Sequence, residues 1–280
     1  MRALDEQTIL ITGSTDGLGL ELAKRLAGKS ATLVVHGRDP QRLERALTAI
    51  GGAAHRDRLH GALADFSSLE HVRRLARDVD REFERLDVLV NNAGIAGPAE
   101  RQESADGFEL TLAVNYLSHF LLTLELLPRL RASAPARIVN VASIGQAPLD
   151  FDNVMLERRY DGFLAYRQSK LAQITFTFEL AERLRADRVE DVTVNALHPA
   201  TLMDTKMVRE WFGRAHATVD EGVEALLRLV AGPDLEGVSG RYFNGLSEST
   251  AHEQAYDPEA RRRLWELSER LCGLSSGAIG

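Results

Sequence analysis

The chain has 280 residues, of which 34 are basic and 41 acidic, so its formal net charge is −7. A hydrophobic share of 44% and a charged share of 27% are ordinary for a globular protein, and they exclude a disordered chain, a collagen-like chain and a membrane bundle. The acidic balance argues against binding to a nucleic-acid backbone, and a single cysteine, Cys272, excludes a disulfide within the chain.

Short apolar runs alternate with segments in which apolar residues recur every three or four positions. The apolar runs predict strands at 8–11, 32–36, 58–63, 88–91, 137–141, 192–196 and 240–243. The periodic segments predict helices at 18–26, 41–50, 69–83, 108–130, 163–184, 220–230 and 258–271. Such alternation predicts an α/β fold with one Rossmann-type, doubly wound domain over residues 1–280, in which about seven parallel strands carry helices on both faces.

Two long irregular stretches, 144–162 and 198–213, follow predicted strands. Both should therefore emerge at the carboxyl edge of the sheet, where open α/β sheets bind ligands, and we expect them to be substrate loops. The most apolar stretch, 120–127, contains Thr123 and Glu125 and is too short to cross a bilayer. No signal-peptide pattern is present, so we expect a soluble, cytoplasmic protein with neither a membrane nor a nucleic acid as partner.

Glycines cluster where the first predicted strand gives way to the first helix. Glycine permits a tight turn there, and the helix N-terminus offers backbone N–H groups to a pyrophosphate. A plain turn is the alternative, and the negative charge of Asp16 counts against a phosphate. The spacing, Gly-x-x-x-Gly-x-Gly, also differs from the commoner dinucleotide fingerprint. The candidate cofactor-binding residues of this loop are Gly13, Ser14, Thr15, Asp16, Gly17, Leu18 and Gly19.

The end of the second predicted strand bears on the choice of cofactor. An NAD site usually has a carboxylate there for the ribose 2′-hydroxyl, but no acid occurs at 36–38 and the first is Asp39. Arg38 is available instead, and a guanidinium can hold a 2′-phosphate through two hydrogen bonds. This favours NADP(H), with NAD(H) as a second possibility. The alternative is that Arg38 is simply an exposed side chain at the start of a helix.

Tyr166 and Lys170 lie four residues apart on a predicted helix and therefore share one face. A tyrosine can act as a general acid if a nearby cation lowers its pKa from about 10 toward neutrality. Ser143, at the end of the fifth predicted strand, could hydrogen-bond a substrate carbonyl. The alternative is a buried tyrosine beside a lysine whose ammonium reaches solvent.

With these motifs the chain resembles the short-chain dehydrogenase/reductase family over nearly its whole length. The resemblance rests on the glycine loop, on Asn91-Asn92-Ala93-Gly94, on Asn115 and Ser143, and on Tyr166-x-x-x-Lys170. It implies NAD(P) binding and hydride transfer to or from a carbonyl or alcohol, with Asn115, Ser143, Tyr166 and Lys170 as catalytic residues. The further cofactor contacts that it implies are Asp65, Phe66, Asn92, Ala93, Gly94, Tyr166, Lys170, Pro199 and Thr201.

Within the family the chain resembles the retinol-dehydrogenase-like and protochlorophyllide-reductase-like branch. Ser143 and Tyr166 are 23 residues apart because of an insert at 149–162, and the tail from Ser239 onward is also similar. We expect the chain to lack the N-terminal membrane anchor of the retinoid enzymes. Ala200 replaces a glycine that the family often has, although Thr201 and Thr205 could still place hydroxyls near the cofactor.

The resemblance implies a mechanism in which Tyr166 is the general acid, Lys170 lowers its pKa, Ser143 holds the substrate oxygen and Asn115 holds a water. We expect an NADPH-preferring enzyme that acts on a small molecule; the alternative is an NAD(P)-binding sensor without turnover. The eight histidines are scattered, so no metal site is expected. Relatives associate through the helices at 108–130 and 163–184, which suggests a homo-oligomer; the alternative is that the insert before Tyr166 blocks this packing. A hydrophobic substrate is indicated by Leu149, Phe151, Met155, Leu202, Met203, Met207, Trp211 and Phe212, of which the last two could equally fasten their loop to the core.

Overall fold

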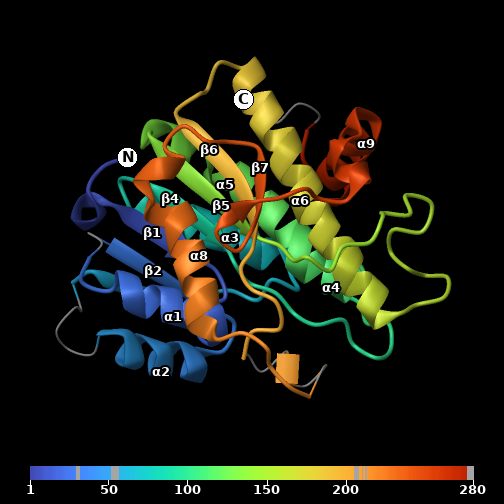
Figure 1. Ribbon diagram of the computed structural model, residues 1–280, viewed down its shortest axis with the longest axis horizontal. Helices are drawn as coiled ribbons and strands as arrows, with labels where there is room; N and C mark the ends of the chain where they lie inside the picture. The colour runs from blue at the N-terminus through green and yellow to red at the C-terminus, as the bar shows by residue number, and fades with distance from the viewer. Residues whose placement is uncertain (30–31, 52–56, 205–207, 210, 212, 276–280) are drawn as a thin grey trace.

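The computed structural model describes residues 1–29, 32–51, 57–204, 208, 209, 211 and 213–275. Within this part of the chain, one sheet of eight strands has the order β3-β2-β1-β4-β5-β6-β7-β8 (Figure 1). Its first seven strands pair in parallel, and β8 is antiparallel to β7. The strands are β1 Thr8–Ile11, β2 Thr32–Gly37, β3 Leu59–Leu63, β4 Val88–Asn91, β5 Ala136–Val141, β6 Val192–His198, β7 Arg241–Asn244 and β8 Ser247–Glu248. The predicted seven parallel strands are thus confirmed, and the two-residue β8 was not predicted.

The central strands are buried along their whole length. Every residue of β1, β4, β5 and β6 is buried, whereas the edge strand β3 is partly exposed. These four strands read as nearly continuous apolar runs because helices cover both faces of a parallel sheet.

Helices form a layer on each face of the sheet (Figure 1). One layer comprises α1 Gly17–Leu26, α2 Pro40–Gly51 and α8 Val219–Ala231, whose apolar residues share a core with β1 and β2. The other comprises α3 Leu69–Glu82, α4 Leu110–Leu112, the π-helical turn η3 Ala113–Leu117, α5 Ser118–Ala132 and α6 Gly162–Ala186. Short turns η1 Leu4–Glu6, η4 Pro233–Leu235 and η5 Glu253–Tyr256 and the last helix, α9 Pro258–Leu271, complete the described chain. The doubly wound prediction is confirmed.

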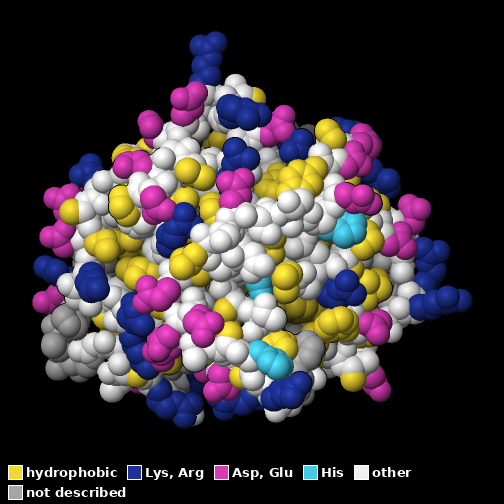
Figure 2. Space-filling model, in the orientation of Figure 1, with side chains coloured by type: hydrophobic (Ala, Val, Ile, Leu, Met, Phe, Trp, Pro, Cys, Tyr) yellow, Lys and Arg dark blue, Asp and Glu magenta, His cyan; other side chains and the backbone are white. Residues whose placement is uncertain are grey.

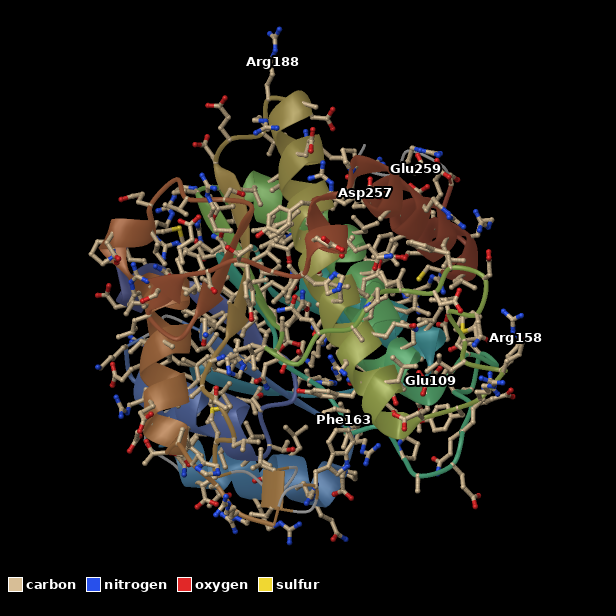
Figure 3. All side chains as sticks on the ribbon, turned by 45° about the vertical axis from the view of Figure 1, so that its right-hand side comes forward. Glu109, Arg158, Phe163, Arg188, Asp257 and Glu259 are labelled. Atoms are coloured by element: carbon tan, nitrogen blue, oxygen red, sulfur yellow. The ribbon has the colours of Figure 1, made fainter. Side chains whose placement is uncertain are left out.

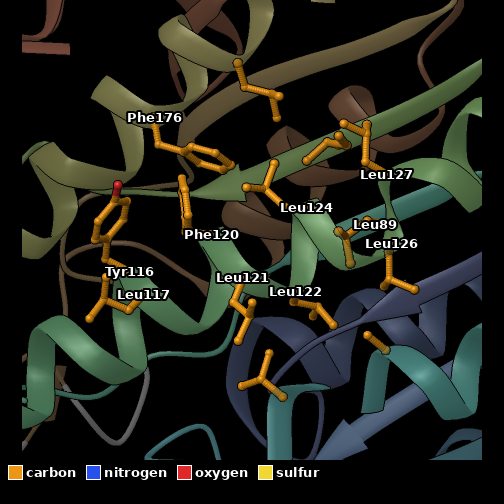
Figure 4. Packing of buried hydrophobic residues seen from close by; sticks show 14 of the residues in the cluster. Leu89, Tyr116, Leu117, Phe120, Leu121, Leu122, Leu124, Leu126, Leu127 and Phe176 are labelled. Atoms are coloured by element: carbon orange, nitrogen blue, oxygen red, sulfur yellow. The ribbon is translucent and has the colours of Figure 1, made fainter. Parts of the chain in front are cut away.

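The helix expected at 108–130 extends further than its most apolar part suggested. From Leu110 to Ala132 it has 23 residues, and its most apolar 18-residue window has a mean hydropathy of 1.4, so by length and composition alone it could cross a membrane. The stretch 120–127 is thus part of a longer apolar helix that continues on both of its sides. In this fold 89% of its most apolar window is buried inside the protein. It forms the centre of the larger core, where Phe120 packs against Phe176 of α6 (Figure 4).

Helix α9 closes the outer side of α5 and α6. Its boundary follows from local chemistry, because Asp257 accepts a hydrogen bond from the backbone of Glu259 and Pro258 occupies the first turn. The indole of Trp265 is 2% exposed, and its centroid lies 5.2 Å from that of Phe120 and 5.9 Å from that of Phe176. The C-terminal helix is therefore part of the main core.

Trp265→Ala should lower the free energy of unfolding by about 3–5 kcal/mol, because a buried indole is replaced by a cavity between α5, α6 and α9. Denaturant titration would measure the loss. Arg262→Ala on the exposed face of the same helix serves as the control, since its ion pairs with Glu259 and Glu266 are exposed and should contribute little. Equal effects of the two substitutions would contradict the assignment of α9 to the core.

Candidate active site

The segments that follow β1, β2, β3, β4, β5 and β6 all emerge at the carboxyl edge of the sheet (Figure 1). Strand order reverses between β1 and β4, and such a reversal opens a crevice at this edge in doubly wound sheets. Every predicted cofactor-binding or catalytic residue lies on one of these segments or on the helices beside them. The sheet therefore brings together residues that are as far apart in sequence as Gly13 and Thr201.

The glycine loop is held against the segment after β4. Gly13 has a φ of +63°, and a Cβ there would lie 2.6 Å from the Cα of Ala93. A Cβ on Gly19 would lie 2.5 Å from Nδ2 of Asn92. That same Nδ2 donates to the carbonyls of Thr12 at 2.8 Å and Gly13 at 3.0 Å. The packing of the chain thus requires both glycines, and Asn92 and Ala93 fix the shape of the loop.

His36, at the end of β2, is a second support of the loop that the sequence did not single out. Its Nδ1 accepts a hydrogen bond of 3.0 Å from the backbone of Gly13, so its proton lies on Nε2, which is 3.0 Å from the carbonyl of Ala64. The ring stacks on Phe66 with centroids 4.3 Å apart. Burial lowers the pKa of His36 to about 4, so the ring is neutral at physiological pH. The sequence did contain a signal for this role: a histidine occurs at position 36, where an NAD site usually has a carboxylate.

The first backbone N–H group of α1 is hydrogen-bonded within the protein. Asp16 accepts a hydrogen bond of 2.8 Å from the backbone of Gly17, whose φ is +52°. Leu18 is buried, and the hydroxyl of Ser14 accepts from the backbone of His36 at 3.0 Å. The loop is therefore ordered by its own hydrogen bonds, and Asp16 acts as the helix cap.

The charged side chains after β2 and β3 differ in their hydrogen bonds to the protein. Arg38 is exposed and has no side-chain hydrogen bond or ion pair within the described part of the chain. Asp39 accepts from the backbone of Arg42 at 2.9 Å and so caps α2. Asp65 accepts from the backbone of Ser67 at 3.0 Å. At the end of β2, the guanidinium is thus free to bind a ligand and the nearest carboxylate is engaged.

Two of the predicted catalytic residues, Asn115 and Lys170, lie beside Gly94, and the other two are paired with each other. A Cβ on Gly94 would lie 3.4 Å from Oδ1 of Asn115 and 3.7 Å from Nζ of Lys170. Tyr166, one turn before Lys170 on α6, hydrogen-bonds Ser143 at the end of β5. The absence of a side chain at Gly94 leaves space in front of the ammonium, which is the kind of recess that a ribose would fill.

The side chain of Asn115 is engaged with its neighbours. Its Oδ1 accepts from the backbone of Ile95 at 2.8 Å, and its Nδ2 donates to the carbonyl of Ile95 and to Oγ of Ser169, both at 3.0 Å. Asn115 sits in the π-helical turn η3, a feature that often marks functional positions. Both amide protons are used within the protein, so the side chain fixes the segment after Gly94.

The pKa of Tyr166 is raised in the structure, whereas the proposed role as a general acid led us to expect a lowered pKa. Burial raises the pKa above 10, and the hydrogen bond with Ser143 opposes this only in part. Burial also lowers the pKa of Lys170 to about 7, and its Nζ lies 5.6 Å from the centre of the Tyr166 ring. Burial thus outweighs any lowering by the neighbouring lysine, and the expectation that Lys170 lowers the pKa of Tyr166 stays a prediction.

The loop after β6 reaches Tyr166 through an indole. The ring centroid of Trp211 lies 5.4 Å from that of Tyr166 and 5.6 Å from that of Phe163. Thr201 Oγ1 lies 3.0 Å from Nε2 of His198, and Pro199 lies close to Gly222 of α8. Thr205, Met207 and Phe212 lie outside the described residues. The loop thus contacts the proposed acid through Trp211.

The insert at 149–162 is fastened on the side of α6 and η5. Leu149 exchanges two backbone hydrogen bonds with the side chain of Gln254, and Gln168 donates to the carbonyl of Val154 at 2.8 Å. Leu149 is 4% exposed and belongs to the main core, which corrects its assignment to the substrate pocket. The insert leads back to α6 at Phe163, while its Arg158 points outward (Figure 3).

Among the described residues, no group of three or more His, Cys, Asp or Glu side chains could hold a metal ion. His198 is buried, and burial lowers its pKa to about 4, in agreement with a structural role.

Gly13→Ala should weaken cofactor binding and lower stability by about 1–3 kcal/mol, since its Cβ combines a strained φ with a clash against Ala93. Isothermal titration with NADPH and thermal unfolding would measure the two effects. Gly107→Ala is the matched control, because Gly107 has a φ of +80° but no atom within 4 Å of the added Cβ. Unchanged affinity in Gly13→Ala would contradict the placement of the cofactor at this loop.

Comparison with known proteins agrees with this geometry. Residues 7–215 match the model of the short chain dehydrogenase family. The chain is 37% identical to mouse retinol dehydrogenase 13 over 286 residues, which span 96% of this chain and 84% of that protein. Mouse polyprenol dehydrogenase is also 37% identical, over 285 residues that span 96% of this chain and 84% of that protein. A crystal structure of a protein from Mycobacterium paratuberculosis superposes with a TM-score of 0.80 at 29% identity, covering 98% of this chain and 96% of that one. The chain therefore belongs to the short-chain dehydrogenase/reductase family of NAD(P)-dependent oxidoreductases, in the branch of the retinol dehydrogenases.

Proposed function

We propose that the protein is an NADPH-preferring oxidoreductase that interconverts a carbonyl and an alcohol on a hydrophobic small molecule. The observation that carries this proposal is the grouping of Ser143, Tyr166 and Lys170 at the carboxyl edge of the sheet: Tyr166 hydrogen-bonds Ser143, and Nζ of Lys170 lies 5.6 Å from the centre of the Tyr166 ring. A proton donor, a second hydroxyl and an ammonium meet there beside the glycine loop. This set of groups suits reduction of a carbonyl or oxidation of an alcohol.

The preference for NADPH is supported by the charges at the end of β2. Arg38 is exposed and free of protein partners in the described chain, so it can bind the 2′-phosphate. Asp39 is bonded to the backbone of Arg42, and His36 is neutral and engaged with Gly13. No carboxylate at 36–38 competes for the ribose hydroxyl.

Each residue has a distinct part in the proposed chemistry. Bound nicotinamide supplies or accepts the hydride. Ser143 donates a hydrogen bond to the substrate oxygen, and Tyr166 gives that oxygen a proton during reduction. Lys170 offers its ammonium to the recess above Gly94. Because burial raises the pKa of Tyr166, the tyrosine is protonated at neutral pH, which favours reduction over oxidation in this state.

A hydrophobic substrate is supported by the side chains near Tyr166. Phe163 is 46% exposed, and Trp211 packs on both Phe163 and Tyr166. On the face shown in Figure 2, basic and acidic side chains are interspersed. Two of the relatives are named retinol dehydrogenase and polyprenol dehydrogenase, and both names refer to apolar alcohols. A cytoplasmic location and self-association stay predictions.

Tyr166→Phe should lower kcat by about 10²- to 10⁴-fold, because the positioned proton donor is lost. The affinity for NADPH and the melting temperature should change little, since only a hydroxyl is removed. Oxidation of NADPH with a panel of hydrophobic aldehydes and ketones provides the assay. Full activity of this variant on a confirmed substrate would overturn the proposed mechanism.

Arg38→Asp should weaken NADPH binding by about 10- to 100-fold while leaving NADH affinity nearly unchanged, the size of one charge-assisted contact. Arg45→Asp, an exposed charge reversal on α2, controls for the general change in field. Titration of both cofactors against all three proteins is the measurement. Similar affinity of the unmodified protein for NADPH and NADH would refute the preference.

A further inference from the structure

Three buried side chains form a chain of hydrogen bonds that runs inward from Lys170. Its Nζ donates to Oε1 of Gln173 at 2.8 Å, and Nε2 of Gln173 lies 2.9 Å from Nδ1 of His119. Lys170 is 4% exposed, and Gln173 and His119 are each 1% exposed. The chain joins α6 to α5 behind the candidate active site, and the proposed mechanism does not use Gln173 or His119.

The direction of each hydrogen bond follows from what each group can donate. An ammonium only donates, so the carbonyl oxygen of Gln173 must face Lys170. The amide nitrogen then faces His119, whose Nδ1 must accept, so the ring proton lies on Nε2. Burial and the nearby charge of Lys170 lower the pKa of His119 well below its usual value, in agreement with a neutral ring. The neutral histidine therefore fixes the orientation of the amide.

Two of the three ammonium protons are engaged within the protein. One goes to the carbonyl of Val141 at 2.9 Å and one to Gln173. The recess above Gly94 also faces Nζ, at 3.7 Å from the position that a Cβ would take. With two acceptors fixed behind the ammonium, the third proton is left for the side of the cofactor.

Within the described chain, no carboxylate pairs with Lys170. The titratable groups that face it are Tyr166 on its own helix and His119 on α5, with His36 of β2 beyond His119. Val141 and Gln173 thus supply the acceptors that offset the burial of the ammonium. Val141 contributes a backbone carbonyl, so Gln173 is the side chain that substitution can change.

We propose that Gln173 is a positioning residue: with neutral His119, it holds the ammonium of Lys170 so that one proton faces the cofactor site. The inference rests on the proposed function for the role of Lys170. Removing the acceptor should let the ammonium turn and should make its charged form less favourable. Both effects reach the cofactor through Lys170 alone.

Gln173→Met tests this, because methionine keeps the length of the side chain and lacks the acceptor. Gln168→Met is the matched control: Gln168 is a buried glutamine on the same helix that donates to Val154 and does not contact Lys170. At pH 7, Gln173→Met should weaken NADPH binding about 10-fold, the size of one hydrogen bond to a charged group, and Gln168→Met should leave it unchanged.

Unfolding at several pH values gives a readout that is independent of activity. Burial lowers the pKa of Lys170 from 10.5 to about 7, so the unfolded chain binds more protons between these values and stability rises with pH across that window. Gln173→Met should extend this rise about one pH unit lower, so its loss of stability should be larger at pH 6 than at pH 9. The loss in Gln168→Met should be the same at both.

Gln173→Glu provides the opposite change and a second variant if methionine prevents folding. Its carboxylate keeps an oxygen for the ammonium and adds a negative charge, so it should raise the pKa of Lys170. The part of the pH–rate profile that reflects Lys170 should therefore shift to higher pH in Gln173→Glu and to lower pH in Gln173→Met. Parallel pH profiles for Gln173→Met and Gln168→Met, with unchanged NADPH affinity, would overturn the inference. Lys170→Met separates the two proposals: if it leaves turnover and cofactor affinity intact, the proposed function fails, and the stability profiles still report on Gln173.

Discussion

The close packing of the glycine loop against the segment after β4 is the contact on which the rest of the site depends. β1 and β4 are neighbours in the sheet, so Gly13 meets Ala93 at the point where the strand order reverses. The two hydrogen bonds from Asn92 tie the loops together, and His36 secures the loop from the side of β2. A side chain at Gly13 would separate these loops and displace Gly94, which forms the floor of the recess in front of Lys170. Cofactor geometry and catalytic geometry are therefore coupled through backbone packing.

Burial sets the chemistry of the site as much as the choice of residues does. The same apolar environment raises the pKa of Tyr166 and lowers that of Lys170, so each moves toward its neutral form. Such a pair has a ready proton donor in tyrosine but only a partly charged lysine. The carbonyl of Val141 and the amide of Gln173 offset the burial without adding a negative charge. A carboxylate in their place would hold the lysine charged and compete with the cofactor for its protons.

Strand and helix positions could be predicted from the sequence because apolar periodicity is a local property. The strand at Thr8–Ile11 and the helix at Pro258–Leu271 agree residue for residue with their predictions. The site was predictable as a set of residues, since Tyr166 and Lys170 are one helical turn apart. Contacts across the sheet could not be predicted, because nothing near His36 in the sequence shows that its ring contacts Gly13. For the same reason Leu149 was placed at the pocket, although it packs in the core with Gln254 as its partner.

Trp211 contacts the candidate active site in a different way from the residues that hydrogen bonds hold in place. The glycine loop and the Tyr166–Lys170 pair are held by buried hydrogen bonds, whereas the loop after β6 meets Tyr166 through ring contact. Aromatic contact tolerates sliding and exchange of partners far better than a hydrogen bond with a fixed direction does. An apolar substrate could therefore replace part of the indole surface on Tyr166 without disturbing Ser143 or Lys170. The edge is therefore divided into a part that directed hydrogen bonds hold in place and a loop that meets this part through an aromatic face.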